Sequence, residues 1–422
     1  MVKKIEKISI IGLGYVGLPL AVGFSKKFKV VGYDINKTRI KQLNNAVDST
    51  KEIINKDDLR GRNITFTWNI KNTKESDFYI ITVPTPLTKK KKPDLSIIEE
   101  AAKKVALVLN KGAIVVLEST VYPGVTEDFL IPILEKNSGL FHKQDFFVGY
   151  SPERINPGDR KNNLTSIKKV LGADKESTLK RIAKIYNSII KAGVHKVSSI
   201  KVAEASKAIE NAQRDINIAF INEVTMLTKK LKIDSNEVLE AAGTKWNFLN
   251  FKPGLVGGHC IGVDPYYLAE AGRKVKFKTE IILAGRKVND NMPNYLLKNI
   301  KTEINIKAKI LLLGLSFKEN IGDIRNSKAI ELAIKIKNNN YRLDCYDPNI
   351  NKKELYSEYG LVMKKPKGKY NCIILAVAHE EFKNLKKNNI LNFCHKKSFV
   401  VDIKGAWKKK LASVKNIKVW CL

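Results

Sequence analysis

The segment from Lys252 to Leu268 contains the residue types with the strongest chemistry in the chain. It is rich in glycine, which lets a backbone approach a ligand closely. It also holds Cys260, next to His259 and four residues before Asp264. A thiol is the most nucleophilic side chain near neutral pH once its thiolate is favoured. The segment therefore indicates a covalent catalyst, with a small buried thiol as the alternative that the segment alone leaves open.

A dinucleotide-binding pattern begins the chain. An apolar strand at residues 8–11 leads into a GxGxxG turn, a helical pattern and a second strand that ends at Asp34. Gly12 allows the tight turn, Gly14 lets a pyrophosphate approach the backbone, and Gly17 lets the helix pack on the strand. Asp34 lies where a carboxylate accepts hydrogen bonds from the adenosine ribose, and it would repel the 2′-phosphate of NADP. The pattern predicts NAD as the cofactor.

Further strands are expected at residues 78–83, 113–117 and 146–150. Polar residues follow each of them, namely Thr85, Thr120 and Glu153. Ligands of doubly wound sheets bind at the carboxyl ends of the strands, so these positions favour a functional role. A capping role for Thr120 and a surface position for Glu153 are the alternatives.

The middle of the chain reads as one long helix at residues 198–232, in which Lys207 and Asn211 share a face. From Lys309 a second α/β pattern begins that lacks a full GxGxxG. The predicted fold is α/β, with two Rossmann-like doubly wound lobes joined by the long central helix. The predicted domains are 1–197 for NAD binding, 198–302 for the helix and the cysteine, and 303–422 as the second lobe.

Composition excludes some classes of function. The 422 residues suffice for two or three domains, and no apolar run reaches the length of a membrane span. The formal charge of +34 comes from lysines spread along the whole chain, which does not favour nucleic-acid binding. Five dispersed cysteines without CxxC spacing argue against a disulfide framework or a metal site. A cytoplasmic protein is expected.

Seven ordered motifs resemble the UDP-glucose/GDP-mannose dehydrogenase family. They are Ile11–Leu20, Val83–Pro86, Glu118–Val121, Ser151–Arg154, Glu204–Asn211, Gly257–Asp264 and Leu315–Lys318. The resemblance covers essentially the whole chain. It implies an NAD lobe, a central helix that forms a homodimer, and a C-terminal lobe that binds the UDP part of a nucleotide sugar.

The family's reaction is a four-electron oxidation of a sugar C6 alcohol to a carboxylate with two NAD+. The resemblance makes Cys260 the nucleophile that traps the aldehyde as a thiohemiacetal and then as a thioester. It makes Lys207 and Asn211 stabilisers of the oxyanion, and Asp264 the acid that positions water together with Lys207. It implies that Glu153 is the general base of the hydrolysis and that the Thr120 hydroxyl orients the water.

The resemblance also implies two sets of binding residues. The cofactor set is Gly12, Gly14, Tyr15, Val16, Gly17, Asp34, Thr85, Thr120 and Arg325. The substrate set is Glu153, Arg154, Lys207, Asn211, Lys252, Gly257 and Lys318.

Some residues depart from the UDP-glucose branch, which usually reads Gly-Gly-Ser-Cys. Here His259 precedes Cys260 and Val263 precedes Asp264, which resembles the branch that oxidises UDP-N-acetylglucosamine or UDP-N-acetylgalactosamine for surface polysaccharides. UDP-N-acetylmannosamine and UDP-glucose stay as alternatives, and the epimer is left open.

A basic nucleic-acid-binding Rossmann protein is the alternative outside enzymes. Lys245 and Arg286 are candidate sugar or cross-subunit contacts, with plain surface cations as the alternative.

Overall fold

The computed structural model describes residues 7–50, 52–53, 55–155, 164–258 and 261–422. The chain divides into two compact units. Unit 1 comprises Met1–Glu210 and Tyr266–Phe277, and unit 2 comprises Asn211–Pro265 and Lys278–Leu422. The three-domain division with boundaries after residues 197 and 302 stays a prediction.

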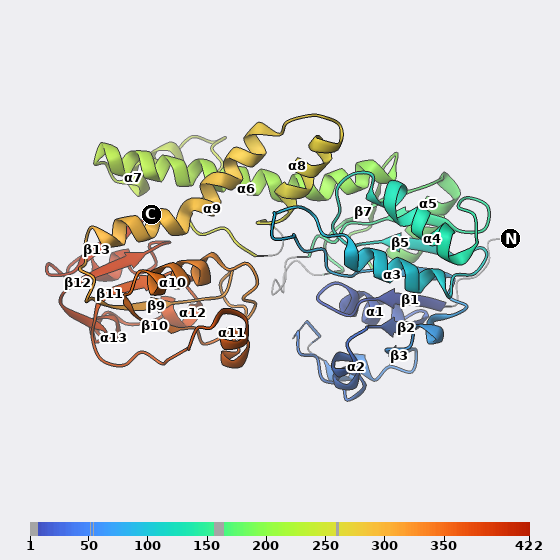
Figure 1. The fold of residues 1–422 in the computed structure, drawn as a ribbon, viewed down its shortest axis with the longest axis horizontal. Coiled ribbons are helices and arrows are strands. Elements are labelled where there is room, and N and C mark those ends of the chain that lie inside the picture. Colours follow the sequence, from blue (N-terminus) through green and yellow to red (C-terminus); the bar gives the residue numbers. More distant parts are fainter. Residues whose placement is uncertain (1–6, 51, 54, 156–163, 259–260) are drawn as a thin grey trace. The chain divides into compact units, whose positions relative to one another are not determined.

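Unit 1 contains the elements of the first lobe (Figure 1). Its strands are β1 (Lys7–Ile11), β2 (Lys29–Tyr33), β3 (Ile64–Thr67), β4 (Phe78–Ile81), β5 (Ile114–Leu117), β6 (Phe147–Tyr150), β7 (Lys169–Ala173) and β8 (Val194–Lys196). Its helices are α1 (Gly17–Ser25), α2 (Lys37–Asn44), α3 (Ser96–Ala106), α4 (Ile131–Ser138) and α5 (Glu176–Asn187), with short turns η1 (Lys56–Leu59), η2 (Ile70–Thr73) and η3 (Thr126–Leu130). Helices α6 (Ile200–Leu231) and α8 (Asp264–Lys274) have residues in both units.

The described strands of unit 1 form one sheet in the order β3-β2-β1-β4-β5-β6-β7-β8. Its first six strands pair in parallel, and the order 3-2-1-4-5-6 is that of a dinucleotide-binding sheet. The switch point lies between β1 and β4. Strands β1, β4 and β5 are buried along almost their whole length, which explains their continuous apolar runs. The predicted Rossmann lobe is confirmed.

Strand β7, like β8 beside it, runs opposite to the first six strands of this sheet. It pairs with β6 in antiparallel register, with Gly149 opposite Ala173 and Tyr150 opposite Gly172. Continuing that register beyond β6 brings Lys169, the first residue of β7, opposite Glu153. The first residue of one strand therefore lies beside the polar residues that follow the other strand.

Unit 2 contains the second lobe. Its elements are α7 (Ser235–Ala242), α9 (Glu280–Lys301), β9 (Lys309–Leu313), α10 (Lys328–Asn338), β10 (Arg342–Tyr346), α11 (Lys352–Tyr359), β11 (Tyr370–Leu375), α12 (Glu380–Lys383), α13 (Lys387–Leu391), β12 (Cys394–Asp402), α14 (Lys408–Leu411) and β13 (Lys418–Cys421). The described strands pair in parallel in the order β10-β9-β11-β12-β13, with the switch point between β9 and β11.

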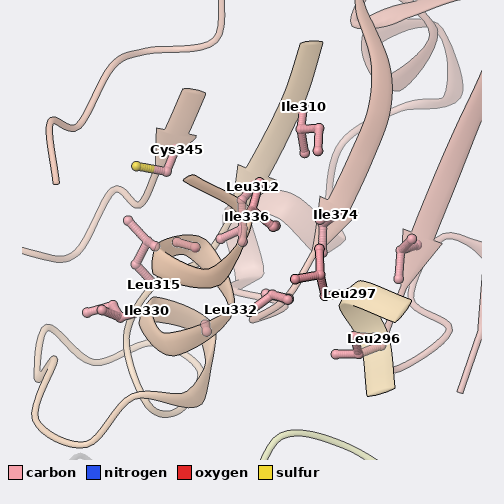
Figure 2. Packing of buried hydrophobic residues seen from close by; sticks show 14 of the residues in the cluster. Leu296, Leu297, Ile310, Leu312, Leu315, Ile330, Leu332, Ile336, Cys345 and Ile374 are labelled. Carbon is pink, nitrogen blue, oxygen red and sulfur yellow. The ribbon is translucent and has the colours of Figure 1, made fainter. Parts of the chain in front are cut away.

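One of the two hydrophobic core clusters of this lobe lies between the sheet and two helices, and the other contains Leu311, Ile373 and Trp407. Figure 2 shows Leu312 and Ile374 of the strands facing Ile336 of α10 and Leu296 of α9. All of these side chains are buried. Burying a Leu or Ile side chain contributes roughly 1.5–3 kcal/mol to stability, so this contact fixes α9 and α10 against the sheet.

The long helix α6 confirms the predicted central helix. In unit 2 its buried Asp215 pairs with Arg286 of α9 at 2.5 Å, and the amide of Asn289 donates to Asp215. Arg286 is only 1% exposed, so the alternative of a plain surface cation is wrong for this residue, whereas Lys245 is exposed. Within the described ranges, no helix is both long and apolar enough to cross a bilayer.

Candidate active site

The GxGxxG turn has the geometry that a dinucleotide requires. Gly12 adopts a φ of +98°, which L side chains rarely adopt. A Cβ at Gly17 would overlap the Gly12 carbonyl oxygen and the Thr82 hydroxyl, so only glycine lets α1 come this close to β1. A Cβ at Gly14 would meet nothing within 4 Å, and this residue is exposed. The glycine that should face the pyrophosphate is therefore open on its Cα side.

Asp34 stands at the end of β2 beside this turn. Its Oδ2 accepts a hydrogen bond of 2.8 Å from the Leu13 N–H, and its Oδ1 accepts one from the Asn36 N–H. The carboxylate stays partly exposed. The nearby Arg39 is buried, donates to the Leu13 carbonyl and pairs with Asp48 at 2.8 Å. An acid at the ribose position beside an arginine that is already paired fits NAD better than NADP.

The other predicted cofactor residues of unit 1 lie near the same edge. Tyr15, Val16, Thr85 and Thr120 are all partly buried. Thr85 follows β4 and Thr120 follows β5, which is its neighbour in the sheet. The carboxyl ends of neighbouring parallel strands meet at one edge, so both threonines lie where a ligand of this sheet binds.

Glu153 follows β6, is buried, and accepts hydrogen bonds on both of its carboxylate oxygens. Its Oε1 accepts hydrogen bonds of 2.6 Å from the backbone N–H groups of Arg154 and Ile155. Its Oε2 accepts from the ammonium of Lys169 at 3.1 Å. The alternative of a surface acid at Glu153 is therefore wrong. Arg154 pairs with Glu210 of α6 at 2.7 Å.

Glu204 of α6 orders the loop that follows β5. Its carboxylate accepts from the N–H of Gly124 at 2.5 Å and from that of Thr126 at 2.9 Å. Burial raises the pKa of Glu204 to about 7, although both backbone donors favour the ionised form. The loop from Thr120 to Thr126 is thus attached to α6 through one carboxyl group.

Helix α6 presents Lys207 and Asn211 one turn apart, and both are buried. In unit 2 the amide of Asn211 donates a hydrogen bond of 2.5 Å to Asp264, the first residue of α8. Asp264 is 1% exposed. The structure therefore brings together two of the predicted catalytic residues, which lie 53 positions apart in the sequence.

The predicted nucleophile Cys260 and its neighbour His259 lie outside the described residues. The chain before them is fixed at several points in unit 2. The side-chain amide of Asn222 bonds both backbone groups of Gly254, at 2.8 and 3.0 Å. A Cβ at Gly257 would overlap the Asn326 carbonyl oxygen, and one at Gly258, where φ is +82°, would approach the Phe317 ring to 2.6 Å. Glycine is thus required where the cysteine segment passes the second lobe.

The predicted ligand residues of unit 2 have different exposures. Lys318 is partly buried, and the Ser316 hydroxyl donates to its carbonyl oxygen at 2.8 Å. Gly257 is partly buried and Lys252 is exposed. Arg325 is exposed and pairs with Asp323, two residues away. Phe317 places the Leu315–Lys318 motif against Gly258, and the contact of Lys318 with substrate stays a prediction.

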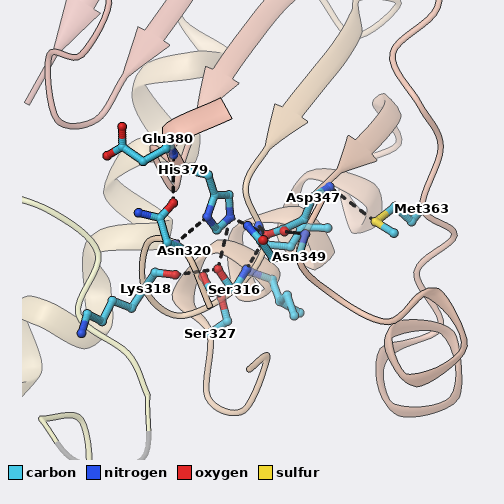
Figure 3. Close-up of polar contacts among 11 residues, drawn as sticks. Ser316, Lys318, Asn320, Ser327, Asp347, Asn349, Met363, His379 and Glu380 are labelled. Atoms are coloured by element: carbon cyan, nitrogen blue, oxygen red, sulfur yellow. Dashed lines mark hydrogen bonds and ion pairs between the residues drawn. The ribbon is translucent and has the colours of Figure 1, made fainter. Parts of the chain in front are cut away.

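The turn after β9 in the second lobe has the same hydrogen bonds as the turn after β1 in the first lobe, but its aspartate is shut off from solvent. The Gly314 N–H bonds the Tyr346 carbonyl, and Asp347 Oδ2 accepts from Leu315 N–H at 2.7 Å, as Asp34 does from Leu13. Asp347 is 0% exposed, however, and also accepts from His379 at 2.9 Å (Figure 3). Burial raises the pKa of Asp347, but the bonds from His379 and the backbone outweigh it and hold that pKa below its ordinary value.

His379 connects this turn to the loop after Lys318. Its Nδ1 accepts from the Asn320 N–H at 2.8 Å, and the Asn320 side chain accepts from the Glu380 N–H at 2.9 Å (Figure 3). Because Asp347 is bonded to protein groups throughout, it has no face for a ribose. The second lobe therefore closes the position that corresponds to Asp34 of the first lobe.

The four cysteines outside the opening segment behave as small core residues. Burial raises the pKa of Cys345 and of Cys394 to about 11 and that of Cys421 to about 12, and it also raises the pKa of the fully buried Cys372. These thiols stay protonated near neutral pH and are poor nucleophiles.

Sequence reasoning missed several residues around Glu153. Lys169, Glu118 and Tyr186 form a buried group with it, and Glu204 fixes the adjoining loop. Glu118 and Glu204 carry a signal, since both belong to the motifs that resemble the family. Lys169 carries none, because it stands in a lysine-rich stretch of an already lysine-rich chain.

The comparisons with known proteins cover most of the chain. Three models of the UDP-glucose/GDP-mannose dehydrogenase family match it: the NAD binding domain at residues 6–190, the central domain at 201–291 and the UDP binding domain at 311–409.

Two curated relatives are named UDP-N-acetyl-D-glucosamine 6-dehydrogenase. The one from Salmonella typhi is 49% identical over 94% of this chain and 96% of its own length. The one from Pseudomonas aeruginosa is 47% identical over the same shares of the two chains. A solved structure of UDP-D-ManNAc dehydrogenase from Pyrococcus horikoshii superposes with a TM-score of 0.86 at 31% identity, covering 98% of both chains. The chain therefore belongs to the UDP-glucose/GDP-mannose dehydrogenase family and is an NAD-dependent nucleotide-sugar dehydrogenase.

Proposed function

We propose that this enzyme oxidises the C6 alcohol of a UDP-N-acetylhexosamine, UDP-GlcNAc or UDP-GalNAc, to the uronate. The substrate branch is supported by the names of the two relatives that share nearly half of their residues with almost the whole chain. The chemistry is supported by the buried hydrogen bond between Asn211 and Asp264, just after the cysteine segment. The product would supply a surface polysaccharide pathway.

The first oxidation converts the C6 alcohol to an aldehyde. NAD+ would supply the hydride acceptor when bound, and the Gly12–Gly17 turn and Asp34 would hold its pyrophosphate and ribose. The hydroxyl proton leaves to water that Asp264 and Lys207 position. Asp264 is prepared for this role because Asn211 holds one of its oxygens and burial excludes bulk water.

The second oxidation requires the aldehyde to be held covalently. The Cys260 thiolate adds to C6 and forms a thiohemiacetal, and loss of a second hydride leaves a thioester. Lys207 and Asn211 stabilise the oxyanion, since a cation and an amide in a buried site favour developing negative charge. The ammonium of Lys207 also favours the thiolate.

Hydrolysis completes the reaction. Glu153 accepts a proton from a water that the Thr120 hydroxyl orients, hydroxide adds to C6, and the Cys260 thiolate leaves. The balance is one alcohol, two NAD+ and one water giving one carboxylate, two NADH and three protons. Arg154, Lys252, Gly257 and Lys318 would hold the UDP-sugar, and Arg325 would lie on the cofactor side.

A panel of substrates tests the branch. NADH formation is measured with UDP-GlcNAc, UDP-GalNAc, UDP-ManNAc, UDP-glucose and GDP-mannose, and kcat/KM is compared. We expect UDP-GlcNAc or UDP-GalNAc to give the highest kcat/KM. Preference for UDP-ManNAc or UDP-glucose would overturn the branch and leave the oxidation standing.

A cysteine substitution tests the covalent step. Cys260→Ala should abolish uronate formation, whereas Cys421→Ala, at a thiol that burial keeps protonated, should leave it intact. Full turnover by Cys260→Ala would contradict the thioester route and favour a two-electron dehydrogenase.

We also propose that the enzyme is a homodimer through α6. Ile209, Phe220, Leu227 and Leu231 are each more than half exposed, and their spacings of eleven, seven and four residues place them on one helical face. An apolar stripe of this kind on a long helix marks a protein interface. Light scattering should give twice the mass of the chain for the wild type, and Phe220→Glu with Leu227→Glu should give the monomer mass.

A further inference from the structure

Glu153 belongs to a buried cluster of charged residues in unit 1. The ammonium of Lys169 donates to Glu118 Oε2 at 2.5 Å, to Glu153 Oε2 at 3.1 Å and to the Pro152 carbonyl at 3.2 Å. Its three protons therefore all have acceptors. Tyr186 of α5 donates to the other oxygen of Glu118. Glu118 and Lys169 are 1% and 2% exposed.

The composition of this group is unusual for a purely structural contact. Two carboxyl groups share one ammonium, and Glu118 and Lys169 are shut off from solvent, which leaves one acidic group in excess. Replacing such a group with apolar residues usually costs little or even stabilises a protein. Burial raises the pKa of Glu118, while Glu118 and Glu153 together raise the pKa of Lys169 against the effect of burial. Lys169 thus stays positively charged beside Glu153.

The fold makes this contact through the reversed strand. Lys169 reaches Glu153 because β7 runs antiparallel to β6, so the first residue of β7 lies beside the residues that follow β6. Glu118 follows β5, the other neighbour of β6. Three adjacent strands therefore each contribute one charged residue to the same edge of the sheet.

We propose that Lys169 is a positioning residue for Glu153: its ammonium holds Glu153 Oε2, and Glu118 holds that ammonium in place. This rests on the proposed role of Glu153 in hydrolysis. Lys169 is an opposite charge and Glu118 a like charge near the Glu153 carboxyl group. The two neighbours therefore act on Glu153 with opposite sign, and a merely structural group would have no such signature.

The test compares pH profiles of kcat between pH 5 and 9 for three variants. Lys169→Met should move the acid limb of the profile to higher pH by about one unit or more, the scale of an opposite charge at this distance. Lys169→Arg keeps the charge and should leave the limb near its wild-type position. Glu118→Gln should move the limb to lower pH. Lys180→Met, at an exposed ion pair with Glu176 on α5, is the matched control and should not move it.

The outcomes separate positioning from stability. If Lys169→Met lowers the rate or the melting temperature without moving the limb, or if Lys169→Met and Glu118→Gln move it in the same direction, the inference is overturned. Should Lys169→Met fail to fold, Glu118→Gln still decides, because it leaves one carboxylate paired with one ammonium.

A further variant separates this inference from the proposed function. Glu153→Gln should lose at least a hundredfold in turnover if Glu153 is the base, the scale expected for general base catalysis. Normal turnover by Glu153→Gln would overturn both the base and its positioning, yet leave the oxidation of a UDP-sugar standing. A wild-type enzyme that oxidises no nucleotide sugar would instead remove the proposed function.

Discussion

Asp34 and Asp347 hold the same position in two lobes, and only one of them has a face for a ligand. Each accepts a hydrogen bond from the backbone of the first turn of its own lobe, through Leu13 or Leu315. Asp34 stays partly exposed, whereas Asp347 is 0% exposed and bonded to His379. His379 and three backbone N–H groups thus occupy the aspartate of the second lobe, whereas the aspartate of the first lobe stays open on one side.

Removing the carboxylate at Asp34 should weaken the preference of the enzyme for NAD over NADP. In Asp34→Ser, we expect the ratio of kcat/KM for NAD to that for NADP to fall by roughly tenfold or more, the scale of a hydrogen bond to a charged group. Steady-state rates with each cofactor measure the ratio. Asp57→Ser, at an exposed acid of the same lobe, is the control. An unchanged ratio in Asp34→Ser would show that another residue selects NAD.

Removing the charge at Asp347 should destabilise the second lobe and spare NAD binding. Asp347→Asn leaves His379 and three backbone N–H groups with a weaker acceptor, so we expect a loss of about 2–3 kcal/mol in the free energy of unfolding. Because the pKa of Asp347 is held below its ordinary value, its stabilisation is present above pH 4 and is lost as the pH falls through the folded-state pKa. Urea unfolding at several pH values should show the two proteins converging only in acid.

Glu204 should make the free energy of unfolding fall as the pH rises, which is opposite to the effect of Asp347. Its pKa is raised to about 7 in the folded protein, so its contribution is fully present below its ordinary value of 4.5 and is lost as the pH rises through about 7. We expect the difference in unfolding free energy between wild type and Glu204→Gln to shrink between these pH values. A difference that is constant with pH would mean that Glu204 is ionised throughout.

The hydrogen bond between Asn211 and Asp264 should matter for turnover rather than for binding. Asn211→Ala should lower kcat by about a hundredfold, the scale of losing one oxyanion donor, with a smaller change in KM. Asn217→Ala, on the same helix and bonded only to a backbone carbonyl one turn away, should have little effect. Equal losses in both variants would point to damage to α6 and not to the site.

The sequence predicted the elements that have strong local signals. The GxGxxG turn, the terminal acid Asp34 and the helix from Ile200 to Leu231 follow from glycine spacing and apolar periodicity, and the structure confirms them. Helix α8 was not predicted, because Asp264 and the residues after it were interpreted as part of the cysteine segment.

The residues around Glu153 could not be predicted, for a physical reason. Lys169 becomes important only because β7 is antiparallel to β6, and strand direction leaves no local mark in the sequence. His379 is similar: it acts through Asp347, 32 residues away, and nothing near it in the chain indicates that contact. Roles that depend on tertiary pairing are set by the fold and not by the local sequence.

The stoichiometry of NADH formed from limiting UDP-GlcNAc, or from UDP-GalNAc if the substrate panel ranks it first, tests the central claim most directly. Excess NAD+ and a known small amount of the sugar nucleotide are incubated to completion, and the NADH absorbance and the product at C6 are measured together. The account predicts two NADH and one uronate for each sugar consumed. One NADH with an aldehyde product, or no NADH, would contradict it.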